Sequence, residues 1–476
     1  KIAFESQLVK FVADTLLKVP DTSIYIPYPF PFGYFTYNPN DSFALSNSSN
    51  NESQFAIKNV QLHFAKVRSG KCSLHVESSL KQPSIFNCQL TSATKSGIKL
   101  NINLPLKAGT IANPAKADTI IDLSNYDLDL RGNSGNKYNT LVKNLQIKIA
   151  PNAQPDSVKY GQSVNTTVTF LSIVPEYGQG YFGNQTIKVG PSTTVFDIFN
   201  KIKAGNLNLN SANLQLKVIN DFGIDMQAKI NSITSINSVT NNTVTMTGSP
   251  IAGSFNVNRA INTGIPSNPI IPTTKILNLT NLNSNIVNFI DNLPSSIGYS
   301  LSAQLNPFGN ISGSNDFAYY GTSLTSILSV DIPLNFSATN ITLKDTVKID
   351  FSNISRLNNV NYGNLLLHAD NSYPFSLNVQ GYLLDGNNHV VDSLFDNLHN
   401  TVASALLDIN NKVISANTSI LKIPINQDKL NKLRQSKKIY FTSKFNTANQ
   451  PAHVQFYSNY KLDLLLTADI NYSVNK

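Results

Sequence analysis

The sequence contains no tryptophan, two cysteines, two methionines and few charged residues. Charged side chains make up 14% of the 476 residues, against about 25% in ordinary soluble domains. The polar surface must therefore come from asparagine, serine and threonine. These side chains compete for backbone hydrogen bonds, which favours turns and strands over exposed helices. The composition predicts a mainly β fold.

No stretch of about 18 apolar residues is present, so the sequence predicts no membrane-spanning helix. The chain opens on charged and polar residues rather than on the apolar core of a signal peptide. Two interpretations remain, a cytosolic protein or a mature chain after cleavage, and the composition favours the second. We therefore expect a secreted chain whose signal peptide has been removed. A length of 476 residues predicts about three domains.

The net charge of +9 does not indicate a nucleic-acid partner. The densest basic group follows helical spacing: Lys429, Lys432, Arg434, Lys437 and Lys438. An anionic surface is one interpretation. The favoured one is the solvated face of a helix whose Leu430 and Leu433 point inward, because no aromatic interleaving or nucleic-acid module accompanies the basic residues.

Two cysteines in one short region suggest a disulfide. Cys72 and Cys88 flank a polar loop, and a hairpin centred on Leu80 would place them opposite each other. Opposed antiparallel positions bring Cβ atoms within bonding range. A Cys72–Cys88 disulfide would indicate an oxidising compartment; the alternative is two buried free thiols.

The N-terminal region holds two unusual segments. Residues 6–17 have an apolar face at helical spacing, and Pro20 would end such a helix. Residues 25–37 then combine three prolines with seven aromatic residues, which excludes a helix interior or a central strand. We expect this aromatic strip to be extended and to contact a partner protein, the alternative being that it covers its own domain. Its aromatic residues are Tyr25, Tyr28, Phe30, Phe32, Tyr34, Phe35 and Tyr37.

Alternating apolar and polar residues mark several strands. The period of two is clear in residues 98–106, 141–149 and 164–173, and in the second half of 55–67. Turn signals such as Asp385-Gly386-Asn387-Asn388 lie between apolar runs and predict hairpins.

An internal repeat is the most informative feature. Residues 214–228 align with residues 365–379, and Asn220 corresponds to Asn371. A helix signal and a closing strand follow each copy, at 283–290 and 298–305 in the first and at 426–433 and 438–445 in the second. A shared order of elements predicts duplicated, sandwich-like units.

The resulting prediction is a mainly β protein of tandem β-sandwich-like units with a few short helices. We expect four segments: residues 1–54 with the helix and the aromatic strip, a β domain over 55–185, and repeat units over 186–340 and 341–476.

The repeated pattern supports a family resemblance. An alternating strand, an asparagine, an aromatic pair around proline and a second alternating strand occur at 365–379. This pattern resembles late-embryogenesis-abundant type 2 domains and lipid-binding proteins of the TULIP group. The segment 379–395 resembles extracytoplasmic proteins of the Bacteroidota. The resemblance implies a periplasmic or outer-membrane-associated binding protein, in its narrowest form an accessory or plug subunit of a type IX secretion translocon. The sequence departs from the TULIP pattern because it has no long helix with an apolar face.

Motifs for catalysis are not found. The six histidines include no pair at metal-binding spacing, and no Gly-x-Ser-x-Gly elbow is present. Asp127 and Asp129 form a carboxylate pair on one face of a strand, which we interpret as surface charge. We expect no enzyme activity, no cofactor and no metal.

Three functions are compatible with these observations. The leading one is a structural or interaction subunit of an outer-membrane-associated assembly with protein partners. The second is a TULIP-type carrier of a lipid or apolar ligand, which requires an apolar cavity between sheet and helix. An enzyme on a β scaffold is the third.

Overall fold

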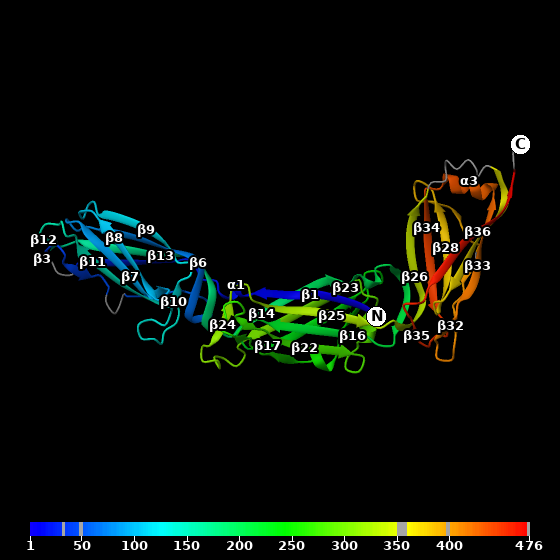
Figure 1. Cartoon of the computed structure of the whole chain (residues 1–476), viewed down its shortest axis with the longest axis horizontal. Coiled ribbons are helices and arrows are strands. Elements are labelled where there is room, and N and C mark those ends of the chain that lie inside the picture. The colour runs from blue at the N-terminus through cyan, green and yellow to red at the C-terminus, as the bar shows by residue number, and fades with distance from the viewer. Residues whose placement is uncertain (31–33, 47–50, 350–358, 397–399, 474–476) are drawn as a thin grey trace.

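The computed structural model describes residues 1–30, 34–46, 51–349, 359–396 and 400–473. Strands dominate this part of the chain and the helices are short, which confirms the predicted fold class. Three sandwich-like units follow one another in an elongated molecule (Figure 1). We call them the N-terminal, middle and C-terminal units.

The N-terminal unit is a sheet with the strand order β2-β13-β6-β10-β7-β11-β4, and β5, β8 and β9 pair with it at the sides. Its core holds Leu74, Phe86 and Ile147, which are fully buried. Its strands are β2 (Thr22–Pro29), β3 (Tyr34–Tyr37), β4 (Ser42–Ala44), β5 (Glu52–Gln54), β6 (Gln61–Ser78), β7 (Ser84–Lys95), β8 (Ile98–Leu106), β9 (Ala115–Asp122), β10 (Asp127–Asp129), β11 (Thr140–Ile149), β12 (Asp156–Lys159) and β13 (Ser163–Tyr181).

The middle unit packs the sheet β1-β25-β16-β22 against the sheet β14-β23-β17-β18. Its elements are β1 (Ile2–Val12), α1 (Ala13–Leu16), β14 (Gln185–Val195), η1 (Asp197–Phe199), β16 (Asn213–Asn220), β17 (Met226–Ile236), β18 (Thr243–Thr245), η2 (Ser249–Ile251), β19 (Ser254–Val257), β20 (Ile261–Asn262), β21 (Ile270–Ile271), β22 (Thr273–Thr280), α2 (Ile286–Asp291), β23 (Ser296–Leu305), β24 (Asp316–Tyr319) and β25 (Ser323–Ile332).

The C-terminal unit has a core of its own. It packs the sheet β15-β26-β34-β28-β29 against the sheet β33-β27-β36. Its elements are β15 (Ile202–Leu209), β26 (Asn335–Lys348), β27 (Val360–Asn371), β28 (Phe375–Leu384), β29 (Val390–Ser393), β30 (Thr401–Val402), β31 (Leu406–Leu407), β32 (Val413–Ser415), β33 (Asn417–Asn426), α3 (Gln427–Gln435), β34 (Lys438–Thr447), β35 (Val454–Gln455) and β36 (Leu462–Tyr472).

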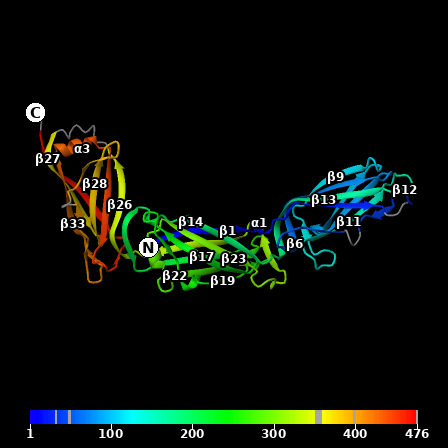
Figure 2. The ribbon, with the colours of Figure 1, turned by 180° about the vertical axis from the view of Figure 1, so that it is seen from behind.

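The predicted helix over residues 6–17 is wrong for most of its length. Residues 2–12 form β1, and only residues 13–16 are helical. β1 lies among the strands of the middle unit, where it pairs antiparallel with β25 (Figures 1 and 2). Ile2, Phe4 and Leu8 alternate with exposed residues and turn toward the core. Tertiary pairing selects this period of two over the helical one.

The sheets combine segments that are far apart in the sequence. β1 joins the middle unit although the aromatic strip, which follows it, belongs to the N-terminal unit. β15 lies between two strands of the middle unit in sequence, yet it pairs with β26 of the C-terminal unit. The predicted boundaries at 54, 185 and 340 assume that each segment forms its own sheets. In the structure, β1 and β15 instead join sheets made mainly by other predicted segments.

The predicted repeat is confirmed in atomic detail. Asn220 ends β16, donates its amide to the carbonyls of Ile224 (3.0 Å) and Asn258 (2.9 Å), and accepts from the Phe222 N–H (2.9 Å). Asn371 ends β27 and repeats these three bonds to Phe375, Ala403 and Tyr373, at 2.8, 2.9 and 2.9 Å. Each asparagine is fully buried at the point where the chain leaves one sheet for the other.

Replacing either asparagine by alanine is expected to destabilise its unit by about 2–4 kcal/mol, because two carbonyls and one N–H would be left buried without partners. Urea unfolding of Asn220→Ala and Asn371→Ala measures the loss. Asn387→Ala, on an exposed hairpin, is the control and should change stability by less than about 0.5 kcal/mol. Equal stability of all three variants would contradict a structural role for the repeated bonds.

Candidate functional site

The aromatic strip forms two edge segments of the N-terminal unit. β2 pairs with β13 at the end of the sheet, and β3 pairs with β12. The extended conformation is therefore confirmed, and the edge position accommodates prolines that cannot donate to a ladder. Phe32 lies outside the described residues, and of Tyr34 the structure describes only the backbone.

The strip packs largely against its own unit. Phe30 and Tyr37 are buried, and Tyr28 and Phe35 are partly buried. The Phe43 ring on β4 packs against three of these rings, with centroid distances of 6.4 Å to Phe30, 5.2 Å to Phe35 and 6.4 Å to Tyr37.

Burial raises the pKa of Tyr37 to about 12. Tyr25 is 62% exposed. Its ring is therefore accessible to a partner protein in the isolated chain, whereas the buried rings of Phe30 and Tyr37 are not. The partner-binding role of the strip stays a prediction.

The predicted cysteine hairpin is wrong. Cys72 on β6 pairs with Phe170 and Ile121, whereas Cys88 on β7 pairs with Leu145 and Ile102. β6 and β7 are separated by β10 in the sheet, and both thiols are free and buried. Short loop length suggested a hairpin, but each long strand finds its partners elsewhere in the chain. These cysteines therefore give no support for an oxidising compartment.

A polar cleft of about 590 Å³ lies at one end of the N-terminal unit, beside the loop at residues 313–315. His63, Asp127, Asp129 and Arg131 line it. Arg131 donates two hydrogen bonds to Asp129, at 2.9 and 2.7 Å, and these bonds lower the pKa of the carboxyl. Asp129 is therefore held ionised and is unsuited to donate a proton. Among the described residues no group of three His, Cys, Asp or Glu side chains could hold a metal.

Three residues of the basic group, Lys429, Lys432 and Arg434, lie on α3, whereas Lys437 follows the helix and Lys438 begins β34. Lys429 contacts Asp392 at 3.0 Å, and Lys432 contacts Asp428 at 2.7 Å. Leu430 is buried beneath them. The helix is amphipathic as predicted, but its basic face is only partly solvated, since the Lys429 side chain is 12% exposed and the Lys432 side chain is 36% exposed.

Strand pairing joins the N-terminal and middle units. β24 from the middle unit pairs with the last residues of β13, from Tyr177 to Gly180. The Tyr177 ring lies 4.6 Å from Tyr319 and 6.3 Å from Phe317. Asn262 forms hydrogen bonds with the hydroxyls of both tyrosines. At this first junction the sheet of the N-terminal unit therefore continues into the middle unit, and the rings of Tyr177, Phe317 and Tyr319 pack together beside it.

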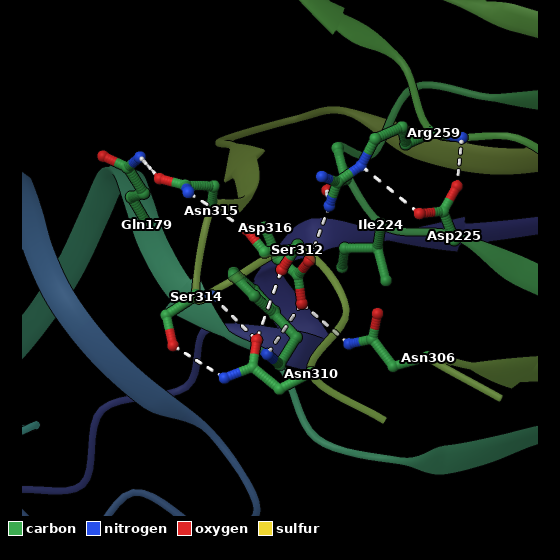
Figure 3. Close-up of polar contacts among 12 residues, drawn as sticks. Gln179, Ile224, Asp225, Arg259, Asn306, Asn310, Ser312, Ser314, Asn315 and Asp316 are labelled. Atoms are coloured by element: carbon green, nitrogen blue, oxygen red, sulfur yellow. Dashed lines mark hydrogen bonds and ion pairs between the residues drawn. The ribbon is translucent and has the colours of Figure 1, made fainter. Parts of the chain in front are cut away.

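Asp316 is the centre of this junction (Figure 3). Its fully buried carboxylate accepts from Arg259 (2.5 Å), from Asn306 (2.7 Å) and from the Phe182 backbone (3.2 Å). Phe182 follows β13, whereas Asn306 follows β23. One carboxylate thus ties the end of the N-terminal unit to two segments of the middle unit. No sequence motif marks Asp316, because its partners come from three separate regions of the chain.

Strand pairing also forms the second junction. β15 completes the sheet of the C-terminal unit by pairing with β26, while its Leu209 is buried in the same cluster as the core of the middle unit. Asp291, at the end of α2 in the middle unit, accepts from the Leu209 N–H at 3.0 Å. Burial raises the pKa of Asp291 to about 7. Phe336 on β26 stacks on Phe456 with centroids 4.7 Å apart. The three units are therefore linked by shared sheets at both junctions.

The two thiols are expected to resist alkylation in the native protein. Burial raises the pKa of Cys72 and of Cys88 to about 12, so at pH 8 both remain protonated and covered, and the thiolate is the reactive form. Iodoacetamide followed by mass spectrometry should label neither residue in native protein and both after unfolding without reductant. Absence of label in the unfolded, non-reduced protein would instead reveal a disulfide.

Removing the junction carboxylate should loosen the first junction. Asp316→Ala leaves the Arg259 guanidinium without its buried partner, and we expect a loss of about 2–4 kcal/mol. Small-angle X-ray scattering should show a broader range of molecular dimensions. Asp428→Ala removes an exposed ion pair (Asp428 side chain 70% exposed) and is the control, with a loss below about 1 kcal/mol. A similar effect of both variants would contradict the role of Asp316.

Comparisons with known proteins add little to this geometry. No protein-family model and no curated protein matches the chain. A Parabacteroides distasonis structure described as a "putative secreted protein" is 13% identical over 60% of this chain and 86% of its own, with a TM-score of 0.29. The VP2 subviral particle of infectious bursal disease virus is 11% identical over 94% of this chain and 86% of its own, with a TM-score of 0.13. Neither likeness carries an argument about function. No helix of the described chain is long and apolar enough to cross a membrane.

Proposed function

We propose that this protein is a non-catalytic structural and interaction subunit that acts outside the cytoplasm and holds binding surfaces at fixed separations. The observation that carries the proposal is the sharing of strands at both junctions. β24 extends the sheet of the N-terminal unit, and β15 extends that of the C-terminal unit. Linked domains that move freely have small interfaces and flexible linkers, whereas here sheet hydrogen bonds cross each boundary.

The extracytoplasmic location is supported by the composition and by the family resemblance. The placement at an outer membrane, and the narrower role as an accessory subunit of a type IX secretion translocon, rest on that resemblance alone. The described residues contribute no contact that favours the translocon over another envelope assembly, so the proposal stays with the broader function.

A carrier of apolar ligands is the second candidate, because one observation favours it. A hollow of about 270 Å³ lies beside α3 and is lined by residues from both sheets of the C-terminal unit. Its lining is entirely apolar: Val360, Leu365, Leu394, Ile423, Ile425, Leu430, Leu433, Ile439 and Ile470. Ligand pockets usually measure about 300–1,000 Å³, so this hollow would suit at most one short acyl chain.

The proposal predicts a defined partner in the native cells. Tagged protein should fractionate with the cell envelope, and chemical cross-linking before lysis should join it to the same one or few proteins in repeated purifications. An unrelated tagged protein of the same compartment is the control. Recovery as a free cytoplasmic monomer would contradict the proposal. Organic extraction followed by mass spectrometry would support the carrier instead if one lipid were recovered per chain.

A further inference from the structure

The last strand of the C-terminal unit has an open edge. β36 pairs with β27 on one side, and in the described part of the chain no strand pairs with its other side. Leu464, Leu465 and Leu466 are 57%, 64% and 58% exposed, and Ile470 is 40% exposed. Long, apolar edge strands are unusual, because their unpaired backbone groups invite another strand.

The repeat identifies the equivalent edge in the middle unit. β16 corresponds to β27, and these strands pair with β25 and β36 respectively. Leu216 pairs with Leu328, and the equivalent Leu367 pairs with Leu466. β36 is therefore the counterpart of β25, residue by residue.

A strand covers the edge of β25. β1 pairs with it over most of its length, and Leu328, Val330 and Ile332 are at most 2% exposed. Their counterparts on β36, Leu466 and Ile470 among them, lie open to solvent. Among the described residues, the C-terminal unit therefore has no strand that covers β36 as β1 covers β25.

The apolar hollow of the C-terminal unit lies beside this open edge. Leu365 and Ile470 both line it, and Leu365 pairs directly with Ala468 of β36. In the middle unit Phe4 of β1 lies opposite Val330, the counterpart of Ala468. A strand added to β36 in the same register would place a large side chain opposite the small Ala468, next to the hollow.

Charge also distinguishes the two edges. Asp331 on β25 contacts Lys1 beside β1 at 3.0 Å. Its counterpart by register is Asp469, because Asn213 pairs with Asp331 and the equivalent Asn364 pairs with Asp469. Asp469 forms no ion pair among the described residues. A basic residue near the start of an added strand would complete this edge.

We propose that β36 accepts an antiparallel β-strand from another protein. The strand would have apolar residues at alternate positions and a lysine or arginine near Asp469. Strand addition of this kind combines main-chain hydrogen bonds with pockets for alternate side chains. The inference rests on the proposed interaction function and names the chemistry of the partner.

A second copy of this chain is a poorer occupant. Its β1 is already engaged with β25, so donating β1 would open one edge to close another. Its β36, paired antiparallel and centred on Leu466, would place Asp463 opposite Asp469 twice. Like charges directly opposite each other destabilise a strand pair.

The test uses the full chain and a synthetic peptide with the sequence of residues 1–12, labelled with fluorescein, as the probe. Fluorescence anisotropy should show saturable binding of this peptide and none of a scrambled one. Leu466→Lys places a charge on the face of the hollow and should weaken binding at least tenfold. Leu465→Lys is the matched control, since Leu465 is equally exposed but faces the other side of the sheet, and should change binding less than threefold.

Exchanging the charges of Asp469 and of Lys1 in the peptide tests whether the peptide binds along β36. Asp469→Lys should weaken binding of the peptide severalfold, and a peptide with Lys1→Glu should regain the loss. The proposal is overturned if the peptide does not bind, if both leucine variants weaken binding equally, or if the charge exchange gives no recovery. It is also overturned if light scattering shows a dimer that Leu466→Lys dissociates. None of these results would affect a partner recovered by cross-linking, so the broader function is tested separately.

Discussion

The edges of β-sheets are the constraint on which this molecule depends. A sheet edge presents unpaired N–H and C=O groups, and a mainly β chain of many short strands creates many of them. Here several edges are covered by segments borrowed from elsewhere: β1 on β25, β15 on β26 and β24 on β13. Covering an edge and joining two units are therefore the same interaction in this structure. The proposed fixed spacing of the units rests on it, and so does the contrast with β36.

Asn220 and Asn371 satisfy unpaired backbone groups inside the middle and C-terminal units. Where the chain crosses from one sheet to the other, backbone groups leave their ladders and need new partners. One side-chain amide supplies two donors and one acceptor, which is what Asn220 and Asn371 provide in identical fashion. Two of the three bonds in each copy join the asparagine to residues within four positions along the chain, so the same crossing forms them again after duplication. This explains why the asparagine was visible in the sequence repeat.

Local patterns predicted much of the fold, and non-local pairing accounts for what they missed. The strand over residues 98–106 has the predicted bounds, and the helices after each repeat, at 286–291 and 427–435, overlap the predicted ranges of 283–290 and 426–433. The helix over 6–17 and the Cys72–Cys88 hairpin failed because distant strands decide both pairings. The role of Asp316 could not be predicted for the same reason, because its partners come from distant parts of the chain. The equivalence of β36 and β25 could not be predicted either, because it depends on how these strands pair with β27 and β16. The sequence repeat covers residues 214–228 and 365–379 and includes neither β25 nor β36.

The borrowed strand β1 also has a consequence for how the protein is made. Ile2 pairs with Ile332, so during synthesis at about 5–20 residues per second the first strand waits roughly 15–65 s for its partner. The N-terminal unit, whose strands are contributed by residues 22–181 except for the late addition of β24, can close in that interval. The middle unit cannot. Until β25 is made, β1 and β16 both lack the strand that lies between them. Pairing β1 with β25 then joins segments about 330 residues apart, and non-local pairing of this kind is slow.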